Sequence, residues 1–416
     1  MVSTSRSVAV PPVLPTSASP APVRWRSRNF HGVAYLLVVL LVGANIPSAL
    51  YGLYRTEFGF SAAVQTAIFA VYVVGMIPSL LLFGPLSDAL GRRAVLGFAA
   101  AAGVVGATTM AFADATVWLF LGRIAQGIAV GAVSAAGTAA LVDYEPDGDH
   151  QRAALVSSAG GALGGGLGPL VGGVVAQYLP HPLQTPFVVF LVALLPAVIA
   201  VALLPRGLRD RSAPLVRLPA IPAAIRRTFW LSTIAVGLSW GGVGLFQAVV
   251  PSWITGQLGV SNLVVGAAAA SLVMVCSVAA QAVSGRLSAR RAERTGLVVL
   301  VVGMLGLAVV AREPVLALLF VVTAVVGAGQ GLTFAGGLRS VNAAVVVHAP
   351  GSQGGVLAAF YVVSYVGLAV PILAAGVAIT AWGTGTAVTV LGVLGAVLCA
   401  AILVLGAVTG RTSPRR

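Results

Sequence analysis

Apolar runs about as long as one membrane-spanning helix recur along the whole chain, and they limit its fold more than any other feature. Three examples without a charged residue are 34–51, 98–112 and 297–310. A helix that crosses the hydrocarbon core of a bilayer needs about 20 predominantly apolar residues. Only 8% of the 416 residues are charged, against roughly 25% in soluble domains. The sequence therefore predicts an all-α integral membrane protein.

The apolar runs divide into twelve predicted spans, six on each side of a polar central segment. Boundaries read from hydropathy alone carry an error of about four residues. The predicted spans are 33–54, 62–83, 94–113, 116–142, 153–177, 186–205, 229–250, 262–284, 296–311, 314–338, 353–377 and 384–408. The predicted organisation is a disordered tail at 1–30, a bundle at 31–205, a basic linker at 206–228, a bundle at 229–410 and a tail at 411–416.

The arginines are distributed unevenly between the two sides of the predicted membrane. The chain has a net charge of +14 and 24 basic residues, all of them arginine. Of these, 21 fall in the tails, the linker and alternate loops, while the opposite loops hold only Arg55 and Arg312. Positive residues mark the cytoplasmic side of a membrane protein. We therefore expect both termini in the cytoplasm and the protein in the plasma membrane. Because the arginines form short clusters between apolar runs, we expect no nucleic-acid partner.

The two halves of the chain resemble each other at a separation of about 200 residues. Gly59-Phe60-Ser61 corresponds to Gly259-Val260-Ser261, and the segment that starts at Gly84 corresponds to the segment that starts at Gly285. A fixed long period indicates duplicated structural units. The sequence therefore predicts two pseudosymmetric bundles of six helices each.

Segment 84–93 reads Gly-Pro-Leu-Ser-Asp-Ala-Leu-Gly-Arg-Arg and lies between the second and third predicted spans. It resembles the signature loop of the major facilitator superfamily. The resemblance implies a conformational latch in which Asp88 contacts a basic residue, an acidic residue that ends the fourth span, and the start of the eleventh span. The residues of this latch are Gly84, Asp88, Gly91, Arg92, Arg93 and Asp143. The alternative is that the arginines only set the topology and that Asp88 is solvated.

Segment 120–127, Phe-Leu-Gly-Arg-Ile-Ala-Gln-Gly, resembles the fourth-helix motif of the same superfamily. A charge such as Arg123 inside a span is costly unless it is paired or faces water, so we expect it to line a cavity between the halves near the midplane. The alternative is that Arg123 extends outward or binds carbonyl groups of the first span near Asn45. The predicted transport pathway comprises Asn45, Arg123, Gln126, Trp240, Gln247, Gln330, Tyr361 and Tyr365, although the weaker members are equally consistent with packing.

Segment 164–173 in the fifth predicted span fits the pattern Gly-x-x-x-Gly-Pro-x-x-Gly-Gly. Proline removes a backbone donor, and glycines allow helices to approach closely. The pattern resembles a motif of the antiporter branches of the superfamily, most of which export drugs. Generic small-residue packing is the alternative. The motif residues are Gly164, Gly168, Pro169, Gly172 and Gly173.

Acidic residues are predicted only in loops or at span ends, so no carboxylate is expected near the midplane. With Arg123 as the deepest charge, a central cavity would repel lone cations and accept neutral or anionic compounds. A transported proton would then be carried by Asp88, by Asp143 or by the substrate. The ten acidic residues are Glu57, Asp88, Asp114, Asp143, Glu145, Asp147, Asp149, Asp210, Glu293 and Glu313.

The resemblance and these residues together predict a secondary active transporter that works by alternating access and exports small organic molecules in exchange for protons. An importer or uniporter of a neutral or anionic nutrient is the alternative within this fold, and a receptor or scaffold that does not transport is the alternative outside it. Cys276 and Cys399 fall inside apolar runs and predict neither a disulfide nor a metal site. We expect no enzymatic activity, no cofactor and a monomer in the lipid bilayer.

Overall fold

The computed structural model describes residues 23–206 and 221–410, and this part of the chain is helical without strands. Twelve of its helices are long and apolar enough to cross a membrane, which confirms the predicted fold class. The helices are α1 (Val23–Asn45), α2 (Tyr51–Phe58), α3 (Ala62–Leu90), α4 (Arg92–Ala111), α5 (Thr116–Tyr144), α6 (His150–Tyr178), α7 (Thr185–Ala202), α8 (Arg226–Ala248), α9 (Val250–Gln257), α10 (Leu263–Ser284), α11 (Ala289–Val310), α12 (Leu316–His348), α13 (Gln353–Trp382) and α14 (Thr384–Gly410), with 3-10 turns η1 (Ile46–Ala49) and η2 (Ala223–Ile225).

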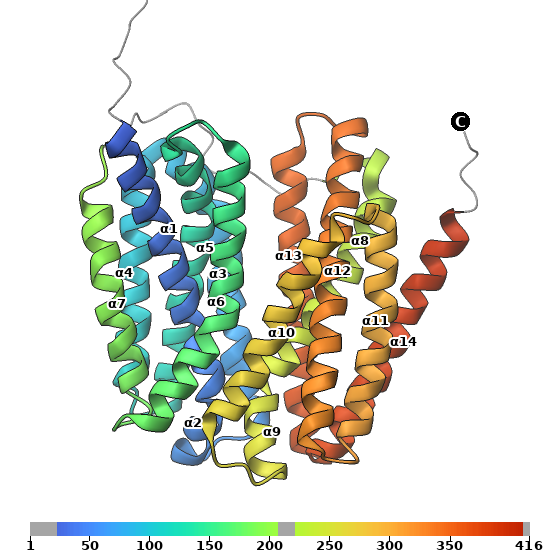
Figure 1. Ribbon diagram of the computed structural model, residues 1–416. Helices are drawn as coiled ribbons and strands as arrows, with labels where there is room; N and C mark the ends of the chain where they lie inside the picture. Colours follow the sequence, from blue (N-terminus) through green and yellow to red (C-terminus); the bar gives the residue numbers. More distant parts are fainter. Residues whose placement is uncertain (1–22, 207–220, 411–416) are drawn as a thin grey trace, which may run out of the picture.

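The long helices form two bundles that lie side by side (Figure 1). One bundle contains α1 and α3–α7, and the other contains α8 and α10–α14. Each has its own apolar core, with Leu36 and Phe187 fully buried in the first and Phe246 and Leu300 buried in the second. The start of α1 and the end of α14 lie on the same side of the molecule, as an even number of spans requires.

The short helices α2 and α9 show the internal repeat most plainly. Each follows the first long helix of its bundle, each has eight residues, and both lie at the same end of the molecule (Figure 1). Gly59 follows α2 directly and Gly259 lies one residue further beyond the end of α9, with φ angles of 67° and 65°. Residues other than glycine rarely adopt this left-handed conformation. The repeated glycines therefore mark two equivalent turns into α3 and α10.

The two ends of the bundles differ in charge, and we name them accordingly. The Arg-rich end holds the first turns of α4, α6, α8 and α11, where Arg92, Arg152, Arg226 and Arg290 lie. The Arg-poor end holds η1, α2 and α9. In the described part of the chain, the hydrogen bonds between the bundles all lie at the Arg-poor end. They join Ala63 N to Thr380 Oγ1 (3.0 Å), Gln65 Nε2 to Ala248 O (2.7 Å) and Ser252 Oγ (3.0 Å), and Leu263 N to Gln177 Oε1 (2.7 Å).

Glycines let the bundles approach closely at the Arg-poor end. A Cβ atom on Gly376 of α13 would collide with Thr66 of α3, and one on Gly173 of α6 would collide with Ala267 of α10. Helix pairs α3/α13 and α6/α10 carry most of the contact between the bundles. The molecule is therefore closed at its Arg-poor end by small residues and a few hydrogen bonds.

Several predicted boundaries are corrected by the structure, because helices extend into segments that look polar. Helix α1 begins at Val23, inside the predicted tail 1–30. Helix α8 begins at Arg226, inside the predicted linker, and α11 begins at Ala289 instead of 296. In both helices arginines occupy the first turns, which lowers hydropathy without preventing helix formation. The predicted segments at 1–22, 207–220 and 411–416 lie outside the described residues.

Candidate functional site

Arg92 connects the two acidic residues of the predicted latch. Its Nη1 lies 2.5 Å from Oδ1 of Asp88 at the end of α3, and its Nε lies 2.8 Å from Oδ2 of Asp143 at the end of α5. Gly91, with φ 91°, separates α3 from α4 and brings Arg92 back toward both carboxylates. Three helix ends of the first bundle are thus joined by one guanidinium group. Charge-assisted pairs of this kind are stronger than neutral hydrogen bonds.

The remaining partners implied by the motif resemblance are not joined to this group. Arg93 donates instead to the carbonyl of Leu204, two residues beyond the end of α7. Within the described residues, Asp88 forms its ion pair with Arg92, and no hydrogen bond links it to the start of α13 at Gln353. The latch residues therefore form a cluster inside the first bundle at the Arg-rich end. The hydrogen bonds between the bundles lie at the opposite, Arg-poor end.

Arg123 on α5 is almost completely buried, with 3% of its surface exposed. Its Nη1 donates to the carbonyl of Ala44 at 2.6 Å and to Oε1 of Gln126 at 2.8 Å. Ala44 is the next-to-last residue of α1, where carbonyl groups lack a partner in a following turn. The guanidinium also lies 4.6 Å from the ring centre of Tyr72. In this conformation Arg123 thus binds a carbonyl group at the end of the first span. This contact is the one expected if Arg123 does not line a cavity.

The charge of Arg123 is not neutralised by a carboxylate in the described part of the chain, where the ion pairs involve other residues. Its Nε and the Nε2 of Gln126 are buried and have no hydrogen-bond partner there. Buried polar groups are nearly always hydrogen-bonded, and each exception requires an explanation. The pair Arg123 and Gln126 therefore retains unused capacity to donate hydrogen bonds.

Aromatic residues of the second bundle approach this region. Tyr72 of α3 and Tyr365 of α13 pack against the same small cluster, which contains Ala44 at the end of α1. Trp240 of α8 lies edge-on to Tyr365, with ring centres 4.7 Å apart, and its Nε1 is buried without a partner among the described residues. Three predicted pathway residues, Arg123, Trp240 and Tyr365, are therefore connected through one aromatic layer.

Gln126 joins this layer through its hydrogen bond with Arg123, and Tyr361 joins it through successive ring contacts with Phe360, Phe334 and Trp240. Within the described part of the chain, no hydrogen bond brings the remaining predicted pathway residues into it. Asn45 donates back to the carbonyl of Leu41 in α1. Gln330 bonds to Ser277 inside the second bundle. Gln247 is buried, and Tyr361 packs edge-on against Phe360.

The Gly-Pro motif lies on α6 where this helix crosses both α1 and α10. Added Cβ atoms on Gly164, Gly168 and Gly172 would clash with Leu41, Asn45 and Ile46 at the end of α1 and in η1. Gly173 instead faces Ala267 of α10. Helix α6 continues through Pro169 to Tyr178. The motif thus packs one helix tightly against its own bundle and against the other bundle.

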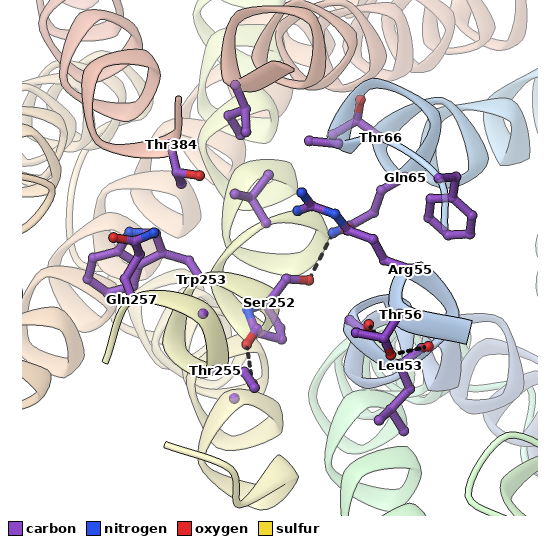
Figure 2. Close-up of a pocket in the computed structure, with 18 of the residues that line it drawn as sticks. Leu53, Arg55, Thr56, Gln65, Thr66, Ser252, Trp253, Thr255, Gln257 and Thr384 are labelled. Atoms are coloured by element: carbon purple, nitrogen blue, oxygen red, sulfur yellow. Dashed lines mark hydrogen bonds between the residues drawn. The ribbon is translucent and has the colours of Figure 1, made fainter. Parts of the chain in front are cut away.

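A cavity between the bundles lies at the Arg-poor end, away from the predicted pathway residues. It has a volume of about 540 Å³ and is lined by both bundles, including Arg55, Gln65, Ser252 and Gln257 (Figure 2). None of the eight predicted pathway residues lines it. The sequence had marked Arg55 only as an exception among the outer loops and had given Gln65 no role.

Glu293, expected in the loop before the ninth predicted span, lies instead inside a helix. It lies in the second turn of α11, half-buried, and its Oε2 accepts hydrogen bonds from Ser232 Oγ of α8 at 3.1 Å and Ser340 Oγ of α12 at 3.3 Å. Ser288, whose side chain accepts a hydrogen bond from the N–H of Arg291, is the N-cap that could have revealed the true start of this helix.

Comparisons with known proteins agree with this architecture. The model of the Major Facilitator Superfamily matches residues 32–367. The chain is similar to the class D tetracycline resistance protein of Salmonella ordonez, 37% identical over 30% of either chain. It is also similar to the multidrug resistance protein MdtL of Klebsiella pneumoniae, 30% identical over 48% of this chain and 51% of the relative. These matches span at most about half the length of the relatives.

Two solved structures share the fold at low sequence identity. A bacterial homologue of the human lysosomal transporter Spinster, in an inward-facing and occupied conformation, has a TM-score of 0.70 at 16% identity over 95% of this chain and all of that one. The nucleoside transporter NupG has a TM-score of 0.71 at 13% identity over 90% of this chain and 99% of its own. On the family match, the twelve spans and the paired bundles, the chain belongs to the Major Facilitator Superfamily of membrane transporters.

Proposed function

We propose that this transporter exports neutral or anionic small organic molecules in exchange for protons. The observation that carries the proposal is the buried guanidinium of Arg123, which has no carboxylate partner among the described residues and a free Nε donor. A buried cation repels other cations and attracts anions and electron-rich groups. A substrate with such a group would meet the unused donors of Arg123 and Gln126 next to the aromatic layer.

The direction of transport is proposed from two further observations. The Gly-Pro motif lies at the contact between α6 and α10, where the bundles must separate during a transport cycle. The tetracycline and multidrug resistance proteins that the chain resembles are named for resistance, which favours export. The structural likeness to a nucleoside transporter keeps import as the second candidate.

The orientation follows from the arginines. We propose that the Arg-rich end and both termini face the cytoplasm and that the protein lies in the plasma membrane. The contacts at the Arg-poor end then close the external side, and the opposite state would open it. Reporter fusions at Gly148 between α5 and α6 should read cytoplasmic, and a fusion at Phe58 should read external. An external signal at Gly148 would reverse the assignment.

Transport in inside-out vesicles tests both direction and coupling. An acidic lumen should drive uptake from a panel of neutral and anionic organic compounds, and a protonophore should abolish that uptake. Vesicles without the protein are the control. Uptake that ignores the protonophore would contradict proton exchange. A preference for permanent cations would contradict the role given to Arg123.

A further inference from the structure

The cavity at the Arg-poor end has the features of a second binding site, distinct from the Arg123 region. Its volume of about 540 Å³ falls within the 300–1,000 Å³ typical of small-molecule sites. A space of this size is much larger than an inorganic ion needs. Its ligand is therefore expected to be an organic molecule.

The charge of the lining selects the kind of molecule. Among the residues that line this cavity in the described part of the chain, Arg55 is the one charged residue. In Figure 2 its side chain extends from α2 into the cavity beside Gln65. Hydroxyl and amide groups of Thr56, Ser252 and Gln257 surround an otherwise apolar lining. One cation, several neutral hydrogen-bonding groups and apolar carbon together fit a monovalent organic anion.

Gln65 gives this site a polar anchor that is itself buried. It is 3% exposed, and its Nε2 bridges the bundles by donating to Ala248 O and Ser252 Oγ. Its Oε1 is buried and has no hydrogen-bond partner among the described residues. Gln65 can therefore accept one further hydrogen bond from the cavity, while the contact to an anionic group falls to Arg55.

The cavity is formed between the two bundles, and each bundle contributes part of its lining. Arg55 and Gln65 belong to the first bundle, whereas Ser252, Gln257 and Thr384 belong to the second. Separation of the Arg-poor ends would divide this lining. A ligand that binds one conformation better than another shifts the population toward it. We propose that the cavity binds a monovalent organic anion from the Arg-poor side and thereby holds the transporter closed at that end.

Dansylate, a permanent monoanion, and dansylamide, its neutral analogue, provide a matched pair of fluorescent probes. Binding is measured by energy transfer from tryptophan to the dansyl group in phosphatidylcholine nanodiscs, since Trp253 lines the cavity. Dansylate should bind about tenfold more tightly than dansylamide, as one charge-assisted contact implies. Arg55→Gln should remove this preference and Arg55→Lys should retain it. Arg312→Gln, which changes the other Arg-poor-end arginine outside the cavity, should leave it unchanged.

Equal affinities of the two probes for the unaltered protein would overturn the proposal. So would a preference that survives Arg55→Gln or is lost equally in Arg312→Gln, because either result would place the anion elsewhere. This measurement needs no transport, so its failure is separate from a failure of the proposed export function.

Spin labels test the conformational effect. They are placed at the Arg-rich ends of α6 and α10 through Leu155→Cys and Val283→Cys, both exposed positions, after replacement of Cys276 and Cys399. Gly173→Val, whose side chain would clash with Ala267, provides a background that disfavours closure. Closure of the Arg-poor end separates the Arg-rich ends, so saturating dansylate should raise the population in which the two labels are far apart. Arg55→Gln should abolish this increase. An unchanged distribution at saturating dansylate would show that the ligand does not hold the closed state.

Discussion

Arg92 and Asp143 lie 2.8 Å apart, between Nε and Oδ2, and their ion pair joins the start of α4 to the end of α5. The same guanidinium holds Asp88 at the end of α3. All three side chains are at least partly accessible, so water can replace each contact at modest cost. A cluster of this kind can rearrange when the bundles move, which a fully buried pair would resist.

Asp88→Asn should reduce transport at least tenfold while expression and membrane insertion remain normal. The substitution keeps the shape of the side chain but removes the charge that pairs with Arg92, and a contact that differs between conformations sets their relative populations. Initial rates in vesicles, normalised to protein detected by antibody, provide the measurement. Ala289→Asp at the equivalent position of the second bundle is the control and should have little effect. Near-normal transport by Asp88→Asn would show that the latch is dispensable.

Arg123→Ala should lower transport of an anionic substrate about tenfold more than transport of a neutral one of similar size. Loss of a hydrogen bond to a charged group costs about 1.5–3 kcal/mol, and the neutral compound forms no such bond. Arg123→Lys, which keeps the charge, should retain part of the preference for anions. Ratios of initial uptake rates for the two compounds cancel differences in expression. A parallel loss for both compounds would assign Arg123 to the end of α1 alone.

Glu293→Gln should abolish proton-driven uptake but preserve exchange of labelled for unlabelled substrate, if Glu293 carries the proton. The amide keeps an oxygen that can accept from Ser232 and Ser340, so packing should be maintained while titration is lost. Glu313→Gln, at an exposed position after α11, is the matched control. Proton-driven uptake that persists in Glu293→Gln would leave Asp88, Asp143 and the substrate itself as the candidate proton carriers.

Gly173→Val should open the Arg-poor end, because the new side chain would clash with Ala267 across the bundle contact. Met274 lies next to Gly165 in the same contact, so Met274→Cys can report this opening. The measurement is the rate at which an impermeant maleimide labels this cysteine in a protein without Cys276 and Cys399. Gly161→Val on the same helix is the control, since a Cβ there meets no atom within 4 Å. Equal labelling rates in the two variants would argue against a gating role for α6.

The fold could be predicted because its determinants are local in the sequence. The length of each apolar run and the internal repeat indicate twelve spans in two bundles without knowledge of any contact. The Arg92–Asp88 pair could also be predicted, since the two residues are four positions apart, whereas Asp143 was expected in the cluster only from the motif resemblance. The acceptor of Arg123 was predicted only as the alternative, a carbonyl group of the first span near Asn45, because the carbonyl of Ala44 is a backbone group that any residue would supply.

The cavity at the Arg-poor end was hidden for a different reason. Gln65 bonds to Ala248 and Ser252, which lie more than 180 residues away along the chain. Pairings between bundles depend on their relative orientation, which hydropathy does not contain. Glu293 was misplaced because Arg290, Arg291 and Arg294 lower the hydropathy of the first turns of α11.

The contacts that close the Arg-poor end also set an energy scale. Four hydrogen bonds join the bundles in the described part of the chain, and a typical hydrogen bond contributes about 0.5–1.5 kcal/mol net. Together they amount to about 4 kcal/mol. A two-state equilibrium moves from 1:99 to 99:1 with about 5.5 kcal/mol. The hydrogen-bonded part of the closure is therefore of the size that one small molecule can supply or offset by binding preferentially to one conformation.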